Sequence, residues 1–171
     1  FEQELEVFCN LGGKILYETP AEELILKEKK VIGVKTSKET LYGDSIILAS
    51  GGFEANEEMR KKFLGDHWKF AKVRGTPNNT GDGLRMAMDA GAILHGNFGS
   101  CHATPMDLYM KDYGNLDIEP SERKKYRKIC YFLGIMINAN GKRFLDEGKN
   151  FRNYTYAQYG AKVLEQPGHF A

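Results

Sequence analysis

The sequence predicts an α+β protein of the α/β kind, in which short strands come first and helices follow. Three observations support this prediction. Short stretches of the first 49 residues alternate like β-strands, two stretches between residues 56 and 91 have the apolar spacing and terminal charges of helices, and two glycine-rich blocks interrupt these patterns. Because strands and helices both contribute apolar faces, a layered arrangement around one core is expected.

Four strands are expected in the first part of the chain. The stretches 12–19 (GGKILYET), 22–30 (EELILKEKK) and 29–36 (KKVIGVKT) alternate and are rich in β-formers. The charged KEKK run between the last two is typical of a hairpin turn, so these three predict an antiparallel meander with one face in water. DSIILASGGF (44–53) is continuously apolar until its glycine pair, which predicts a strand buried on both faces.

Two helices are expected next. The first begins after Asn56, a common capping residue, carries acidic residues in its first turn and basic residues in its last, and ends at Gly65. The second runs from Thr80, another capping residue, to Gly91. Both therefore have start and stop signals that agree with their apolar spacing.

The last third of the chain begins with an irregular, polar stretch from residue 95 to residue 128. CYFLGIMIN (130–138) then predicts a buried strand, and the NANGKRF that starts at its end predicts a hairpin turn. RNYTYAQYGAKVLEQPG predicts a third helix, with Asn153 as its cap and an end before Pro167.

Composition and charge narrow the possible functions. The 171 residues are 42% hydrophobic and 27% charged, which is the range of a soluble globular protein. The net charge of +1 gives no support for a nucleic-acid partner, and the apolar runs are too short for direct membrane insertion. The widely spaced Cys9, Cys101 and Cys130 predict reduced thiols in a cytoplasmic protein, with no metal site.

The block TGDG (80–83) places two glycines at the start of a helix, where each costs about 1 kcal/mol relative to alanine. Because glycine has no Cβ and a helix start has unpaired N–H groups, the block suits a bound polar ligand. A tight packing contact explains the glycines equally well. The block ASGG (49–52) leaves a similar choice between a ligand over the strand end and a simple turn.

Taken together and in this order, SIILASGGFEAN, NNTGDGLRMAMDAGA and GIMINANGKRFLDEG resemble the flavoprotein subunits of the fumarate reductase and succinate dehydrogenase family. Within that family AKVRGT, SCHA and DEGKNFRNYTYAQYG are most similar to the tricarballylate dehydrogenases. The resemblance covers nearly the whole chain and implies FAD as the cofactor. It also implies that residues 1–100 are the central part of a Rossmann-like FAD-binding domain with an antiparallel β-meander, and that residues 101–171 are part of an α+β substrate-capping domain.

The resemblance further implies which residues lie against the flavin. In the family, the block at the strand end touches FAD through its main chain, and the TGDG block lines FAD as well. Ser50 stands here where the family usually has threonine, which is a mild change. The residues implied to bind the cofactor are Ala49, Ser50, Gly51, Gly52, Thr80, Gly81, Asp82 and Gly83.

The resemblance implies hydride transfer to or from flavin N5 and oxidation or reduction of a C–C bond beside carboxylates. The family's proton-transfer arginine lies in a G-x-R-F-x-x-E block, which points to Arg143, with Asp146 or Glu147 as a nearby proton relay. His102 stands where family members keep a histidine that binds a substrate carboxylate. The expected substrate is a small polycarboxylate such as tricarballylate, and the electron acceptor is unidentified.

Two departures from the family pattern argue against fumarate or succinate as the substrate. Ala103 is inserted into the usual His-Pro-Thr, and the Thr-Glu pair that fumarate reductases place before the arginine is missing. On the residues alone, His102 also fits a hydrogen-bonded structural histidine, and Arg143 a turn residue with an exposed salt bridge. The other histidines, expected to be structural or on the surface, are His67, His95 and His169.

No G-x-G-x-x-G fingerprint occurs in the sequence. The chain is therefore expected to be an internal fragment that is inactive alone, binds FAD weakly or not at all, and can self-associate through uncovered apolar faces. Two other functions stay open. One is a non-catalytic binding or assembly module on a flavoprotein scaffold, and the other is a flavoprotein dehydrogenase of a non-carboxylate substrate such as a ketosteroid.

Overall fold

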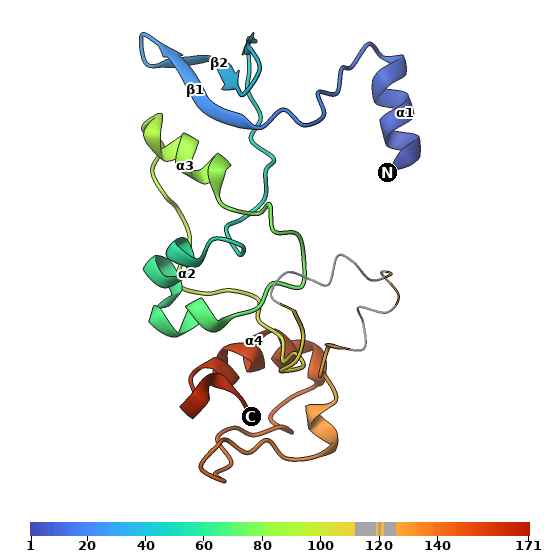
Figure 1. Ribbon diagram of the computed structural model, residues 1–171, viewed down its shortest axis with the longest axis vertical. Coiled ribbons are helices and arrows are strands. Elements are labelled where there is room, and N and C mark those ends of the chain that lie inside the picture. The colour runs from blue at the N-terminus through green and yellow to red at the C-terminus, as the bar shows by residue number, and fades with distance from the viewer. Residues whose placement is uncertain (112–118, 120, 122–125) are drawn as a thin grey trace. The chain divides into compact units, whose positions relative to one another are not determined.

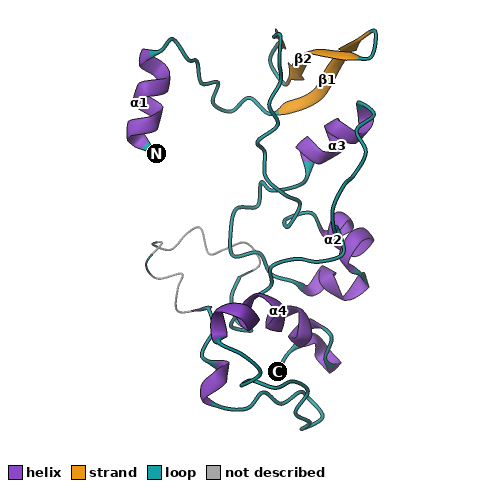
Figure 2. Cartoon of the chain, turned by 180° about the vertical axis from the view of Figure 1, so that it is seen from behind, coloured by secondary structure: helices purple, strands orange, loops and turns teal. Residues whose placement is uncertain are grey.

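The computed structural model describes residues 1–111, 119, 121 and 126–171, and Figures 1 and 2 show its helices and strands. The chain forms two compact units. Residues 1–49 with 85–92 make the first unit, and residues 50–84 with 93–171 make the second. Part of the polar stretch expected between residues 95 and 128 lies outside the described residues.

The first unit is built on a three-stranded antiparallel sheet in the order β1 (Ala21–Lys27), β2 (Lys30–Thr36) and β3 (Thr40–Tyr42). A two-residue turn at Glu28 and Lys29, whose φ angles are 51° and 66°, joins β1 to β2. The predicted meander of 22–36 and its hairpin turn are thereby confirmed. The sequence did not predict β3, because three residues are too few to show an alternating pattern.

The C-terminal part of α3 (Asp82–Asp89) belongs to the first unit and packs on the sheet. Arg85 Nη2 donates to the main-chain oxygen of Glu22 at 3.2 Å, and Met86 and Leu24 are both buried. The predicted helix of 80–91 is confirmed, and its end is closed by the Gly91 N–H.

Two predicted strands of this part of the chain are wrong. Residues 12–19 and 44–53 form no strand, and Tyr17 and Ile47 are 71% and 88% exposed. A strand forms only where a neighbouring strand accepts and donates main-chain hydrogen bonds, and none of the described residues pairs with either stretch. The sequence also did not predict α1 (Glu2–Asn10), a helix without a buried residue.

In the second unit, α2 (Glu57–Leu64) is followed directly by the short 3₁₀ helix η1 (Asp66–Phe70). The predicted cap of α2 is confirmed, because Asn56 Oδ1 accepts a hydrogen bond from the Met59 N–H at 3.0 Å. The predicted end at Gly65 is confirmed as well. This helix start is therefore specified locally, by one side chain.

The second unit also contains α4 (Arg152–Leu164), η3 (Tyr131–Leu133) and η4 (Pro167–His169). The predicted helix is confirmed and ends before the proline, but the predicted cap is wrong. The residue at the cap position is Phe151, which has no acceptor in its side chain, and Asn153 lies inside the helix.

The predicted buried strand of 130–138 is also wrong. Only η3 forms in this stretch, and Leu133 and Ile135 are 78% and 68% exposed, because no strand of the described residues pairs with it. The hairpin turn after it is confirmed. Asn138 accepts a hydrogen bond from the Gly141 N–H at 2.9 Å, and an isolated antiparallel bridge joins Ile137 to Arg143.

Each helix within the described residues is too short or too polar to cross a bilayer. The same residues hold no group of three or more His, Cys, Asp and Glu side chains that could share a metal ion. The three cysteines are exposed and free of disulfides. A sheet and several helices agree with the α+β class.

Candidate functional site

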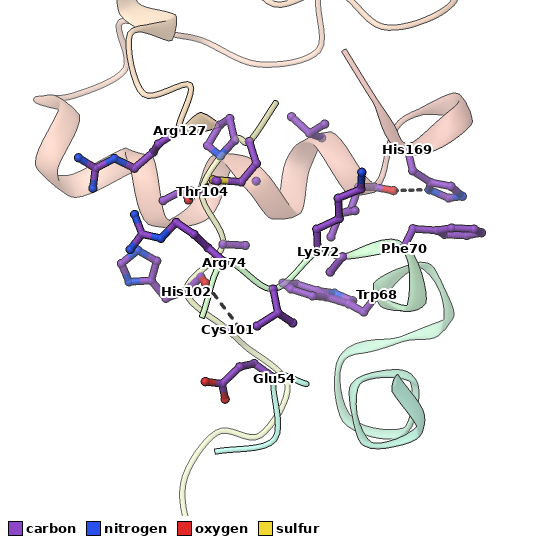
Figure 3. A pocket seen from close by; sticks show the side chains of 18 of the residues that line it. Glu54, Trp68, Phe70, Lys72, Arg74, Cys101, His102, Thr104, Arg127 and His169 are labelled. Atoms are coloured by element: carbon purple, nitrogen blue, oxygen red, sulfur yellow. Dashed lines mark hydrogen bonds between the residues drawn. The ribbon is translucent and has the colours of Figure 1, made fainter. Parts of the chain in front are cut away.

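The second unit contains a pocket of about 470 Å³, shown in Figure 3. The end of η1 and the loop after it (68–75) line one side, the extended segment 101–108 lines another, and α4 contributes a third. A pocket of this volume suits a small organic ligand. All of its lining residues belong to one compact unit.

A buried arginine holds the first wall in place. Arg60 of α2 is only 6% exposed, and its guanidinium donates to the main-chain oxygens of Trp68 at 3.0 Å and Glu54 at 2.5 Å. Burial of a charge is tolerated where such hydrogen bonds satisfy it. Arg60 therefore fixes η1 and the segment before α2 relative to each other.

The second wall is fixed by a main-chain contact with α4. The Gly160 N–H donates to the Ala103 oxygen at 2.9 Å, and the Ala103 N–H donates to the Ala157 oxygen at 2.7 Å. A Cβ on Gly160 would lie 2.6 Å from the Ala103 carbonyl atoms, so the contact requires glycine. Because His102 directly precedes Ala103 in the chain, this contact also fixes the main-chain position of His102.

The predicted carboxylate-binding histidine, His102, lines the pocket. Its ring stands edge-on to Tyr156, with 5.1 Å between the ring centroids and 71° between the planes. Among the described residues, its ring nitrogens have no hydrogen-bond partner. The imidazole is therefore free to donate a hydrogen bond to a ligand oxygen.

The acids of the pocket wall are already engaged. Asp107 accepts a hydrogen bond from the Tyr109 N–H and lies 3.0 Å from Lys128 Nζ, and these contacts hold the pKa of its carboxyl below the ordinary range. Glu54 accepts a hydrogen bond from Asn79 Nδ2 at 2.5 Å. Neither carboxylate pairs with an arginine of the wall among the described residues.

The cations of the wall differ in how they are engaged. Lys72 Nζ donates to the main-chain oxygens of Leu108 at 2.8 Å and Met110 at 2.5 Å. Arg74 and Arg127 have no such partner within the described part of the chain. The sequence did not indicate these two arginines as site residues. AKVRGT, which contributed to the resemblance, was the one available signal for Arg74, and nothing near Arg127 pointed to a pocket.

The structure brings the predicted proton-transfer pair together. Arg143 Nε and Nη2 donate to Glu147 Oε2 at 2.8 and 2.5 Å, and Asp146 Oδ1 lies 3.5 Å from Nη2. Glu147 is 3% exposed and also accepts from the Met136 N–H at 2.5 Å. Neither Arg143 nor Glu147 is among the described residues that line the pocket with His102.

The pair also changes how both groups titrate. The hydrogen bond to Glu147, and then its charge, raise the pKa of Arg143. Burial alone would raise the pKa of Glu147, but the hydrogen bonds from Arg143 and the Met136 N–H outweigh it and hold that pKa below the ordinary value. Both groups are therefore held in their charged forms.

The two glycine-rich segments of the second unit lie side by side. The Ala55 N–H donates to the Asn79 oxygen at 2.9 Å, and Asn56 Nδ2 donates to the Thr80 oxygen at 2.8 Å. The Cβ position of Gly51 lies 3.0 Å from the Asn79 side chain. Ser50, Gly51 and Gly52 thus neighbour the Thr80–Gly83 block, whereas Ala49 belongs to the first unit.

Packing explains one glycine of the TGDG block. Gly81 is buried with a φ of 82°, and a Cβ there would meet Met59 Sδ at 2.4 Å and Phe53 Cβ at 2.9 Å. The Thr80 hydroxyl donates to the Asp82 carboxylate rather than to a main-chain N–H of the helix. Asp82 is exposed. A tight packing contact therefore explains why residue 81 is glycine. A ligand can contact only the exposed atoms of the TGDG block.

The exposed atoms fit a flat cofactor. Ser50 and Gly51 are exposed and carry little or no side chain, so their main chain is accessible to an aromatic ring. Asp82 lies on the neighbouring segment and is exposed as well. This combination of bare main chain and one polar side chain is compatible with FAD.

The chain belongs to the FAD binding domain family, which matches residues 6–167. FAD is therefore the cofactor, as predicted, and the resemblance to the fumarate reductase and succinate dehydrogenase flavoproteins is confirmed at that level. The helices and the antiparallel sheet are accordingly those of a partial α+β FAD-binding domain.

The relatives differ in the reactions that their names describe. A 3-oxosteroid 1-dehydrogenase from Mycolicibacterium smegmatis is 28% identical over 92% of this chain and 28% of its own length. An NADH:acrylate oxidoreductase from Vibrio harveyi is 32% identical over 80% of this chain and 13% of its own length. The chain thus spans less than a third of either protein.

A solved structure supports the fold. The open conformation of a flavocytochrome c3 fumarate reductase superimposes with a TM-score of 0.67 and 20% identity, over 98% of this chain and 28% of that one. This likeness concerns the arrangement of the backbone.

Proposed function

We propose that the full-length protein containing this chain is an FAD-dependent oxidoreductase that acts on a C–C bond of a small polycarboxylate, such as tricarballylate. One observation carries the proposal. In this chain of the FAD binding domain family, the pocket is lined by His102, whose ring has no hydrogen-bond partner among the described residues, and by more cationic than anionic side chains. Carboxylates are the ligands that such groups bind best.

The cofactor side is assigned to the two neighbouring glycine-rich segments of the second unit, Ser50–Gly52 and Thr80–Gly83. FAD supplies a group that accepts or gives a hydride at N5 when it is bound. The exposed main chain of residues 50–51 would support the flat ring, and Asp82 would contact its polar atoms. Residues 1–100 would then be the FAD-binding part, and residues 101–171 part of the substrate cap.

His102 would orient the substrate by donating to one carboxylate. Arg143 does not line the pocket with His102, so a substrate would have to extend beyond the pocket to reach it. There Arg143 would hold the proton that is exchanged with substrate carbon, and Glu147 would fix the guanidinium plane. The raised pKa keeps Arg143 protonated, so the proton is present for reduction, but it also makes Arg143 a weaker acid that releases this proton less readily. In the direction of oxidation it must first release a proton, and the acceptors within reach are Glu147, 2.5 Å away, and Asp146, 3.5 Å away.

A substrate screen of the full-length, FAD-loaded protein tests the proposal. With a dye as electron acceptor, tricarballylate should be oxidised, or its unsaturated counterpart should be reduced with a reduced dye. Turnover of a steroid but of no polycarboxylate would contradict the proposed substrate. A protein that holds FAD but converts neither would instead support a non-catalytic binding or assembly module.

A second candidate is a ketosteroid dehydrogenase. The pocket also has apolar lining, including Trp68, Phe70 and Leu164, and one relative is a 3-oxosteroid 1-dehydrogenase. A steroid needs a long apolar surface and no carboxylate partner. The same screen, with a 3-oxosteroid beside tricarballylate, separates the two candidates.

The 171-residue chain by itself is proposed to bind FAD weakly and to self-associate. Phe1, Leu11 and Ile47 are each more than four-fifths exposed, and burying them against a second copy removes apolar surface from water. Light scattering and a flavin spectrum of the isolated chain test both statements, and a yellow monomer would contradict them.

A further inference from the structure

Two arginines of the pocket wall have no acidic partner among the described residues, Arg74 and Arg127. We infer that they form a second carboxylate-binding site beside His102, and that this site makes the pocket selective for polycarboxylates over monocarboxylates. The inference rests on the proposed function and deepens it, because it states which part of the pocket recognises the extra carboxylates.

The charge of the wall supports this site. Among the described lining residues, Arg60, Lys72, Arg74 and Arg127 carry positive charge, and only Glu54 and Asp107 carry negative charge. Asp107 is paired with Lys128, which does not line the pocket. An entering anion therefore meets uncompensated positive charge, and it is attracted more strongly there than in bulk water.

The hydrogen bonds of each cationic side chain show which of them can still bind a ligand. Arg60 is committed to main-chain oxygens at the back of the wall, and Lys72 is committed to those of Leu108 and Met110. Arg74 is exposed, and Arg127 is half-buried. Since a guanidinium has five donors, both arginines keep their full capacity to bind a carboxylate.

The main chain at Arg127 is anchored although its side chain is not. Residues 126–128 pair with segment 105–107, where the Asp107 N–H donates to the Tyr126 oxygen at 2.7 Å and the Lys128 N–H donates to the Pro105 oxygen at 2.9 Å. An isolated antiparallel bridge joins Met106 to Arg127 between them. The guanidinium therefore extends from a fixed point of the wall.

Figure 3 shows the side chains of Arg74, Arg127 and His102 extending toward the same side of the pocket. They come from three segments: the loop after η1, the strand-like stretch 126–128, and the segment that α4 holds. A planar guanidinium binds a carboxylate through two parallel hydrogen bonds, which a lysine cannot do. Two guanidinium groups and one imidazole suit a ligand with several carboxylates better than a ligand with one.

The test uses the full-length, FAD-loaded protein and calorimetric affinities for tricarballylate and for propanoate, which has one carboxylate. We expect Arg74→Gln and Arg127→Gln each to weaken tricarballylate binding by about 10- to 100-fold, the usual range for a hydrogen bond between charged groups. Propanoate, which His102 alone can hold, should change by less than about threefold, within the range of an ordinary surface substitution. Arg74→Lys should fall between Arg74→Gln and the wild type.

The matched control is Arg152→Gln, which removes one positive charge from the same unit outside the pocket lining. It should leave both affinities unchanged, and the flavin content of every variant reports that it is folded. Equal losses for both ligands, or no loss for tricarballylate, would overturn the inference. A wild type that binds tricarballylate through both arginines without turning it over would overturn only the proposed reaction, and no binding at all would overturn both.

Discussion

The arginines of the second unit differ in whether an acidic side chain binds them. Arg143 is fixed by Glu147 through two hydrogen bonds to one buried carboxylate. Arg74 and Arg127 lie on a pocket wall without an acidic partner among the described residues. A fixed guanidinium can act only on an atom brought to it, whereas an unpaired one can itself bind a ligand. The difference separates a proposed chemical role from a proposed recognition role.

Removing the fixed arginine should have the largest effect. In the full-length protein, Arg143→Ala is expected to lower turnover by about 10²- to 10⁴-fold, the range for loss of a positioned proton-transfer group. Flavin should stay bound, because Arg143 lies outside the glycine-rich segments. A dye-coupled assay and the flavin absorbance measure the two properties. Arg152→Ala serves as the control, and near-normal turnover of Arg143→Ala would remove the proton-transfer role.

A substitution at the contact between α4 and the pocket wall should come next. Gly160→Ala forces a Cβ against the Ala103 carbonyl and is expected to cost about 1–3 kcal/mol, as overpacking usually does. Tricarballylate binding should weaken too, because His102 is displaced. Gly134→Ala is the control, since a Cβ there meets nothing within 4 Å. Equal thermal midpoints for both variants would mean that the contact does not position the wall.

The fixed pair should also show in the pH dependence of stability. The pKa of Glu147 is lower in the folded protein than its ordinary value of 4.5, so its stabilising contribution is complete above that value and is lost as the pH falls through the folded pKa. The wild type should therefore have a higher melting temperature than Glu147→Gln near pH 7. The difference between the two melting temperatures should narrow below pH 4.5. Asp89→Asn, at an exposed carboxylate, is the control. A gap that widens in acid would contradict the pairing.

The smallest expected effect is on the free energy of unfolding. It concerns the two asparagines that the sequence predicted to be helix caps. Asn56→Ala should cost about 1 kcal/mol, because the side chain caps α2. Asn153→Ala should stay within about 0.5 kcal/mol, the range of an ordinary surface change, because this residue lies inside α4. Thermal melts of the two variants rank them, and the reverse order would be inconsistent with the observed caps.

Elements with local signals could be predicted from the sequence. The hairpin of β1 and β2, the Asn56 cap and the Asn138–Gly141 turn each depend on a few neighbouring residues. The strands predicted at 44–53 and 130–138 depended on partners that sequence patterns cannot supply. Helix α1 was not predicted, although Phe1, Leu5 and Phe8 have helical spacing, and none of its residues is buried.

The candidate site divides in the same way. His102, Arg143 and Glu147 were identified by a resemblance that extends along the chain, and the structure pairs the last two. Arg74 and Arg127 were missed, because a pocket wall built from distant segments has no signature in any one of them. The packing role of Gly81 likewise depends on Met59 and Phe53, which lie far away in the sequence.

The central claim is that the pocket binds a polycarboxylate through the unpaired arginines and His102. A crystal structure of the full-length protein with FAD and tricarballylate tests it most directly. The account predicts ligand carboxylates within hydrogen-bond distance of Arg74, Arg127 and the His102 ring. A tricarballylate bound away from all three side chains, with the pocket filled by water alone, would contradict it.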